Sequence, residues 1–570
     1  MLISVSENVR SLGKGLLPLI VGVTGHRDLA QNDDSEIAAL VRGFLCNLQT
    51  TYPHTPMVLL SSLAEGADRV VAQAALDCGV ELYVVLPMET SLYEQDFASD
   101  ESVEQFRRLM AHSYGARIVE APGPERDRHY AAAGAFIVSH SEILIALWDG
   151  NEDEMRGGTS QIVRFALRGV PTDYLSGPRE ALRSNETGAV YHIPVRRQSA
   201  LKPAAAATWR YPETDSSDPG ALGAARAAFE ENLRNLERFN RDAVASPSDS
   251  STNSSGLLLS PQQEAALGAS GALHYTRALF GQADQLALKC RNWTYRATVS
   301  IFGAVALATL LFALYTDVMT DRAALYFGFL AIVVLAFAID LIIVRKRMQD
   351  RFQDYRALAE GLRVQFYWRL AGIHDSVYDH YFARQEGELD WIRNAMRAES
   401  FRPQRQPDVD ASPGRMRALL ETVLAQWIQG EGTYFARVFR REREIANRIR
   451  WSANACLVAT AVAALLLAVT VARSQPAYHG ILIAILTLAL AGAGLLTGYA
   501  QKRAHEEHAR RYRRMAALYR VAGDRLGILL QQGDLTGARR VLVQLGREAL
   551  AETCDWLLLH RERQIDVPTG

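Results

Sequence analysis

Four long apolar runs in the second half of the chain restrict most strongly how it can fold. They cover residues 297–315, 323–344, 452–472 and 480–500 and are between 19 and 22 residues long. A helix needs roughly 20 apolar residues to cross the hydrocarbon core of a bilayer. The connections within each pair are short, so each pair predicts a helical hairpin. We therefore expect an all-α membrane module with four transmembrane helices.

Charged residues at the ends of these runs predict the orientation of the module. Basic residues flank the outer end of each run: Arg291, Arg296, Arg345, Lys346, Arg347, Arg448, Arg450, Lys502 and Arg503. Basic flanks stay on the cytoplasmic side of a membrane. We therefore expect a multi-pass protein of the inner (cytoplasmic) membrane, with both termini and the loop between the hairpins in the cytosol. The first residues, MLISVSENVRSLGKG, lack the apolar core of a signal peptide.

The two hairpins resemble an internal repeat. Trp293 and Trp451 precede them and are 158 residues apart, whereas Tyr355 and Tyr512 follow them and are 157 residues apart. Each hairpin should continue into a long cytosolic helix that is rich in charged and aromatic residues. The repeat predicts two similar membrane-plus-stem units in tandem.

Three polar residues inside the apolar runs are membrane or pore candidates. Asp340 is either a functional intramembrane carboxylate or an interfacial group, since it lies only five residues before Arg345. Asn454 and Thr460 either line a polar path or pack between helices. Four weakly polar helices are too few to enclose much of an aqueous path, so we expect a homo-oligomer.

The first half of the chain has a different pattern, in which short apolar runs alternate with helical ones. The apolar runs predict strands at 17–23, 57–61, 81–87, 116–119, 143–148 and 191–195. Alternating strands and helices are typical of an α/β, Rossmann-like domain with a parallel sheet. There is no G-x-G-x-x-G motif, which disfavours a dinucleotide-dependent dehydrogenase.

Changes in composition predict four segments. Residues 1–200 form the α/β domain, and residues 201–260 form a polar, flexible linker region with a polar helix over 220–240. Residues 261–400 hold the first transmembrane hairpin with cytosolic helices, and residues 401–570 hold the second.

Three polar turns, at residues 24–28, 61–69 and 149–159, follow the predicted strands. Ligands of parallel α/β sheets lie beyond the carboxyl ends of the strands, where all three turns should meet. The third turn also opens a helix, where backbone N–H groups and the helix dipole favour a phosphate. We therefore expect a small nucleotide or nucleotide-derived ligand, of unknown identity, bound by Thr24, Gly25, His26, Arg27, Glu65, Gly66, Asp68, Arg69, Asp149, Gly157, Gly158 and Thr159.

Each turn also has a purely structural explanation. Glu65 and Arg69 either contact the ligand or form a surface pair four residues apart on a helix. His26 and Arg27 either cap the first strand or meet an anion. The turn at 157–159 is either a phosphate site or only a tight connection between strand and helix.

Composition narrows the classes of function. The net charge is −1, which gives no field that would attract nucleic acid. The five cysteines are scattered without a CxxC pair, which argues against a zinc site or a disulfide framework. We assign no catalytic residue and no metal ligand, and an enzymatic role is the less favoured one.

The three turns together resemble the SLOG superfamily, Rossmann-like domains related to DprA and to the LOG nucleotide-processing enzymes. The resemblance rests on Val23-Thr24-Gly25-His26-Arg27, on 62–69 and on Trp148-Asp149-Gly150 with Gly157-Gly158-Thr159. It implies contacts to a nucleotide or a nucleotide-derived signal. The LOG enzymes carry an acidic residue after the threonine of their glycine loop, but Ser160-Gln161-Ile162-Val163 stands here. This departure favours sensing over hydrolysis.

The duplicated hairpin resembles the SLATT family, in which transmembrane and cytosolic helices accompany nucleotide-sensing domains. This resemblance covers about residues 285–540. It implies a membrane effector that opens a pore or perturbs the membrane, in bacterial defence or conflict signalling. Two alternatives stay open: a membrane-tethered nucleotide hydrolase of LOG type, and a membrane scaffold without a ligand.

Overall fold

The computed structural model of the chain describes most of the 570 residues. The expected linker is described only in part, and the first 14 residues lie outside the described ones. The described residues are 15–30, 34–151, 156–174, 187–197, 206–212, 219–246, 254–260, 262–263, 271–381, 389–400, 413–474 and 476–562.

The first half forms one sheet, which has seven strands among the described residues. The strands are β1 (Leu19–Gly25), β2 (Met57–Ser61), β3 (Glu81–Leu86), β4 (Gly115–Ile118), β5 (Ile143–Trp148), β6 (Ala189–Pro194) and β7 (Thr208–Arg210). Their order across the sheet is β4-β3-β2-β1-β5-β6-β7, and every pair is parallel except β6 with β7. The six predicted strands are confirmed. The short antiparallel edge strand β7 lies in the segment expected to be linker.

The order of the strands creates a crossover beside β1. The chain first builds β1 to β4 in one direction and then returns to place β5 on the free side of β1. In the register of this pair, Gly25 lies opposite Leu147. The carboxyl ends of β1 and β5 therefore lie side by side where the strand order reverses, which is the usual ligand position in such sheets.

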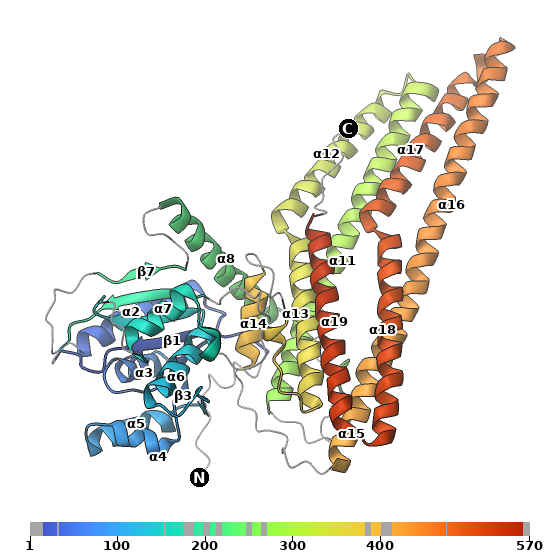
Figure 1. Cartoon of the computed structure of the whole chain (residues 1–570). Coiled ribbons are helices and arrows are strands. Elements are labelled where there is room, and N and C mark those ends of the chain that lie inside the picture. The colour runs from blue at the N-terminus through green and yellow to red at the C-terminus, as the bar shows by residue number, and fades with distance from the viewer. Residues whose placement is uncertain are drawn as a thin grey trace. The chain divides into compact units, whose positions relative to one another are not determined.

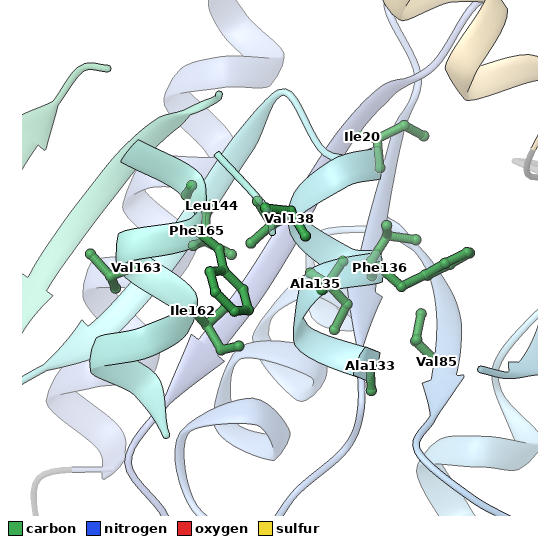
Figure 2. Close-up of a cluster of buried hydrophobic side chains, with 14 of the residues drawn as sticks. Ile20, Val85, Ala133, Ala135, Phe136, Val138, Leu144, Ile162, Val163 and Phe165 are labelled. Carbon is green, nitrogen blue, oxygen red and sulfur yellow. The ribbon is translucent and has the colours of Figure 1, made fainter. Parts of the chain in front are cut away.

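Helices cover both faces of the sheet. They are α2 (Asp34–Thr51), α3 (Ala67–Asp77), α4 (Thr90–Tyr93), η1 (Glu94–Asp96), α5 (Asp100–Ala111), α6 (Arg126–His140), α7 (Thr159–Arg168) and η2 (Thr172–Tyr174). Helix α2 packs on α3, and α6 packs on α7. Figure 2 shows Val138 of α6 close to Phe165 of α7 and Leu144 of β5, and Phe136 and Ile162 belong to the same buried cluster. Burial of these side chains holds both helices on the sheet.

The described residues after β7 form helices and the connections between them (Figure 1). The helices are α8 (Pro219–Val244), α11 (Gly271–Ala313), η3 (Leu314–Val318), α12 (Ala323–Lys346), α13 (Met348–Leu370), η4 (Val377–Asp379), α14 (Asp390–Ser400), α15 (Pro413–Val423), η5 (Leu424–Gln429), α16 (Gly430–Ala472), η6 (Pro476–Tyr478), α17 (His479–Arg503), α18 (His505–Gln532) and α19 (Leu535–Glu562). The polar helix expected over 220–240 is α8.

The chain divides into two compact units. The first, which we call the α/β unit, comprises residues 1–284 and 357–411; the second, the helical unit, comprises residues 285–356 and 412–570. The sheet, α14, the beginning of α11 and the end of α13 belong to the α/β unit. Helices α11 and α13 each continue into the helical unit.

All four predicted apolar runs lie in long helices. Within the described residues, four helices are long and apolar enough to cross a membrane: Ala272–Val318, Ala323–Leu370, Pro413–Ala472 and His479–Gln532. Large apolar side chains on them remain exposed, for example Phe337 at 69% and Leu465 at 66%. Such surface suits contact with lipid rather than water.

The backbone supports the internal repeat. Helices α11 and α16 are both 43 residues long. Arg347 and Ala504, which are 157 residues apart, both adopt a positive φ (44° and 48°), and each stands directly before the next helix. A positive φ is uncommon for a residue other than glycine. The two hairpins therefore share an unusual bend at the same position as well as a sequence pattern.

Candidate functional site

The candidate site is the edge of the sheet where β1, β2 and β5 end. The polar turns that follow these strands contact one another there. The amide of Ala67 donates to the carbonyl oxygen of His26 at 3.1 Å, and the amide of His26 donates to the carbonyl oxygen of Leu147 at 3.1 Å. These two hydrogen bonds join the turn after β1 to the turn after β2 and to β5.

Gly66 allows the first two turns to approach. Its φ is +78°, and an added Cβ would lie 2.4 Å from the carbonyl oxygen of Arg27 and 2.7 Å from that of His26. Only glycine combines this backbone conformation with this close approach. Gly66 therefore shapes the site through its backbone.

His26 forms a pair with Asp149 across the crossover. The distance between His26 Nε2 and Asp149 Oδ1 is 3.2 Å, and the two side chains are 14% and 5% exposed. Burial alone would raise the pKa of Asp149, but hydrogen bonds from Asn151 and His26 hold it below its ordinary value. The pair places an imidazole beside a charged carboxylate, which is an arrangement suited to hydrogen bonding or proton transfer.

Arg27 is the exposed cation of the site. Its guanidinium lies over the ring of Tyr130, 4.9 Å from the centroid. The hydroxyl of Tyr130 in turn donates to Asp96, which pairs with Arg126 at 2.7 Å. Arg27 is thereby oriented by an aromatic face while its charge stays accessible, as an anion site requires.

The third turn lies against the same tyrosine. An added Cβ on Gly157, whose φ is +76°, would lie 2.9 Å from Tyr130 Cβ and 3.0 Å from the carbonyl oxygen of Asp127. The amide of Gly157 donates to Gln161 Oε1 at 2.6 Å, so it is not free for a ligand, contrary to our expectation. The amides of Gly158 and Thr159 at the start of α7 form no hydrogen bond with other described residues. Those two amides are the donors left for an anion.

Glu65 and Arg69 hold the second turn against α5. Arg69 is only 2% exposed and donates to Leu63 O, Ser102 O, Ser102 Oγ and Gln105 Oε1 at 2.7–3.2 Å. Glu65 accepts from the amide of Ala98 at 2.8 Å and from the hydroxyl of Ser102. The surface-pair alternative for these residues is wrong, because Arg69 is buried under α5.

Asp68 is also buried. Burial raises its pKa to about 7, although the amides of Ala64 and Ser62 and the charges of Arg27 and Arg69 oppose the shift. The side chain therefore fixes the second turn from inside. Near it, two buried polar atoms have no hydrogen-bond partner among the described residues, Arg69 Nη2 and the Tyr93 hydroxyl. Buried polar groups are usually paired, so these two atoms provide unused hydrogen-bonding capacity beside the turns.

The structure thus places the twelve predicted residues in two layers. Thr24, Gly25, His26, Arg27, Asp149, Gly157, Gly158 and Thr159 surround the crossover, while Glu65, Gly66, Asp68 and Arg69 support it from the second turn. The sequence argument missed Tyr130, Asp96 and Tyr93. A signal for Tyr130 exists, since a polar first turn, 126–130, precedes an alanine-rich helix that leads into β5.

The membrane candidates show no common site. The hydroxyl of Thr460 donates to the carbonyl oxygen of Cys456 on its own helix at 2.9 Å. Asn454 is exposed, and Asp340 Oδ1 has no hydrogen-bond partner among the described residues. Both alternatives for Asp340 remain open.

Comparison with known proteins gives few matches. No family model matches the chain, and no curated protein matches it. Among solved structures, DNA processing protein A (DprA) from Streptococcus pneumoniae is 21% identical, with a TM-score of 0.18. The match covers 27% of this chain and 46% of that protein, so the chain spans less than half of its length. The site described above therefore stands on its own geometry.

Proposed function

We propose that the chain is a membrane effector that senses a nucleotide-derived ligand in the cytosol and responds by opening a pore or perturbing the membrane. The observation that carries the proposal is the exposed guanidinium of Arg27 at the crossover. The amides of Gly158 and Thr159, which have no partner among the described residues, would add donors for a phosphate. Bacterial defence or conflict signalling is the proposed setting, and a homo-oligomer the proposed assembly.

A chain of buried polar contacts supports coupling between the sheet and the long helices. Arg397 of α14 lies 3.6 Å from Glu142, the residue before β5, and donates to Ser139 O at 3.1 Å. Two residues further, Glu399 pairs with Arg369 of α13 and accepts from Thr276 of α11. Because α11 and α13 continue into the helical unit, a change at the sheet has a physical route towards the apolar helices.

For this route to act as a switch, the ligand must bind one of two states more tightly than the other. The ratio of the ligand's affinities for the two states would then set how far binding shifts the protein towards the open state. Tight binding to both states would leave the membrane part unchanged.

The test is a thermal-shift screen of the full-length protein against nucleotides, NAD, ADP-ribose and its cyclic forms, and cyclic di- and oligonucleotides. The full chain is needed because α14 and the beginning of α11 belong to the α/β unit. We expect one compound class to raise the melting temperature and to cause leakage from liposomes that contain the protein. R27Q should lose both effects, whereas R108Q, which removes an exposed arginine of α5, should keep them. The proposal fails if no compound has either effect.

One observation favours a second candidate, a membrane-tethered nucleotide hydrolase. His26 has a carboxylate partner, Asp149, which a general base would use. Chromatography of the compound after incubation separates the two functions, since a sensor returns it intact. Conversion that is lost in His26→Gln but kept in Arg27→Lys would establish the hydrolase.

A further inference from the structure

A groove lined by arginines lies between α16 and α18 of the helical unit. Its volume is about 1160 Å³, and its arginines are Arg437, Arg440 and Arg441 on α16 and Arg513 and Arg520 on α18. Glycine and alanine residues form part of the lining, among them Gly432, Ala516 and Gly523. Small side chains leave the hollow between the two helices open, and the long arginine side chains surround it.

The positive charges of the groove are not neutralised. All five arginines are exposed, and none forms an ion pair or hydrogen bond with another described residue. Two acidic residues, Glu444 and Asp524, also line the groove, so the positive charge exceeds the negative one by three. Clustered like charges repel each other unless an anion compensates them.

The internal repeat shows what the equivalent face does in the first copy. Leu279 and Ala283 lie 158 residues before Arg437 and Arg441, and both are fully buried in the α/β unit. On α13, which follows the first hairpin as α18 follows the second, Tyr367 is the counterpart of Asp524, 157 residues before it. Tyr367 is buried, and its hydroxyl donates to the carbonyl oxygen of Leu258 at 3.0 Å. At these three positions the first copy therefore packs its own chain, whereas the second copy leaves a hollow there.

We propose that the groove between α16 and α18 is a binding site for a soluble, phosphate-bearing anion. Arginine presents a planar fork that binds phosphate oxygens in pairs, and the excess of three charges suits a ligand with several phosphoryl groups. The volume of about 1160 Å³ is slightly above that of typical small-molecule sites, which is about 300–1,000 Å³, so the groove has room for such a ligand. The site lies in the helical unit and is separate from the candidate site on the sheet.

The position along α16 favours a soluble ligand over a lipid headgroup. Arg441 stands 11 residues before residue 452, where the apolar run begins. At about 1.5 Å per residue this is about 16 Å along the helix axis. The headgroup layer extends only about 5–8 Å beyond the hydrocarbon core. Arg448 and Arg450 are the residues at headgroup depth.

The test is calorimetric titration of the full-length protein with inorganic tripolyphosphate, in nanodiscs of zwitterionic phosphatidylcholine. R437Q/R441Q removes two charges from the groove, and R443Q/R448Q removes two exposed arginines of the same helix that do not line it. We expect the first variant to weaken binding by about tenfold or more. The control should change binding less than about twofold, because its two arginines are exposed to solvent and do not line the groove, so that salt screens their charges. Equal binding by both variants overturns the proposal.

Two further arms separate the sources of phosphate and the two sites. R27Q should bind tripolyphosphate at the groove as the natural protein does; loss of binding in R27Q alone would assign the signal to the sheet and overturn the proposal.

Native mass spectrometry in phosphatidylglycerol nanodiscs counts bound lipids. Loss of bound lipid in R437Q/R441Q, with tripolyphosphate binding unchanged, would assign the groove to headgroups instead. R437K/R441K keeps the charge and should show intermediate affinity with an unchanged helical circular-dichroism signal.

Discussion

The backbone of the candidate site strongly restricts which residue can stand at position 66. Gly66 has a φ of +78°, and any Cβ there would meet the carbonyl oxygens of Arg27 and His26. We predict that Gly66→Ala destabilises the α/β unit by roughly 2–4 kcal/mol, because backbone strain and a steric clash with backbone add together. The melting temperature of the full-length protein would measure this loss.

Gly150 supplies the matched control for this substitution. Its φ of +86° is similar, but an added Cβ would have no neighbour within 4 Å. Gly150→Ala should therefore cost only the strain, about 1 kcal/mol. Equal effects of the two substitutions would show that the close approach of the turns does not matter.

Burial of Asp68 predicts a pH-dependent stability. Its pKa is raised to about 7 in the folded protein, whereas an aspartate in an unfolded chain titrates near 4. Between these pH values the folded state keeps a proton on Asp68 that the unfolded state has lost. This difference stabilises the folded protein at low pH, and the stabilisation is lost as the pH rises through about 7. We predict that the stability of Asp68→Asn, relative to that of the natural protein, increases by on the order of 2 kcal/mol as the pH is raised from 5 to 8.

Melting temperatures at pH 5 and pH 8 check this prediction. Asp77→Asn, which changes an exposed carboxylate at the end of the same helix, should follow the natural protein at both pH values. Glu142, also buried with a pKa of about 7, is present in all three proteins, so its effect cancels. A constant difference between Asp68→Asn and the natural protein would contradict the assignment.

At the scale of elements, the sequence predicts those structures whose cause is local. The six parallel strands are short apolar runs between turns, and the four long helices are longer apolar runs, so length and periodicity suffice. Strand β7 spans only Thr208–Arg210 and depends on pairing with β6. A segment of three residues carries no periodicity, and only the tertiary fold decides its structure.

The candidate site shows the same division. The three turns are predictable because parallel strands present their carboxyl ends at one edge. The partner of His26 is not, since Asp149 lies 123 residues away and becomes its neighbour only through the crossover of β5. Arg69 is similar: spacing suggests a surface pair with Glu65, but the position of α5 over the turn buries it. Contacts set by strand order lie beyond any local pattern.

At the scale of the whole molecule, charge at the helix ends predicts the topology. The connections 316–322 and 473–479 lie at one end of the hairpins, and the basic clusters, including Arg345–Arg347 and Lys502-Arg503, lie at the other. Basic residues near the ends of a span stay on the cytoplasmic side because the membrane potential and anionic lipids hold them there. We predict that both short connections face away from the cytosol.

Single cysteines test this topology in a chain whose five natural cysteines are replaced by serine. Cysteine at Met319 or Ser474, in the two short connections, should react with a membrane-impermeant maleimide added to spheroplasts. Cysteine at Gly533, between α18 and α19, should react only after the membrane is made permeable. The opposite pattern would place the candidate site on the sheet outside the cell, away from any cytosolic nucleotide. Labelling at one connection but not the other would mean that the two hairpins, despite their repeat, do not both cross the membrane.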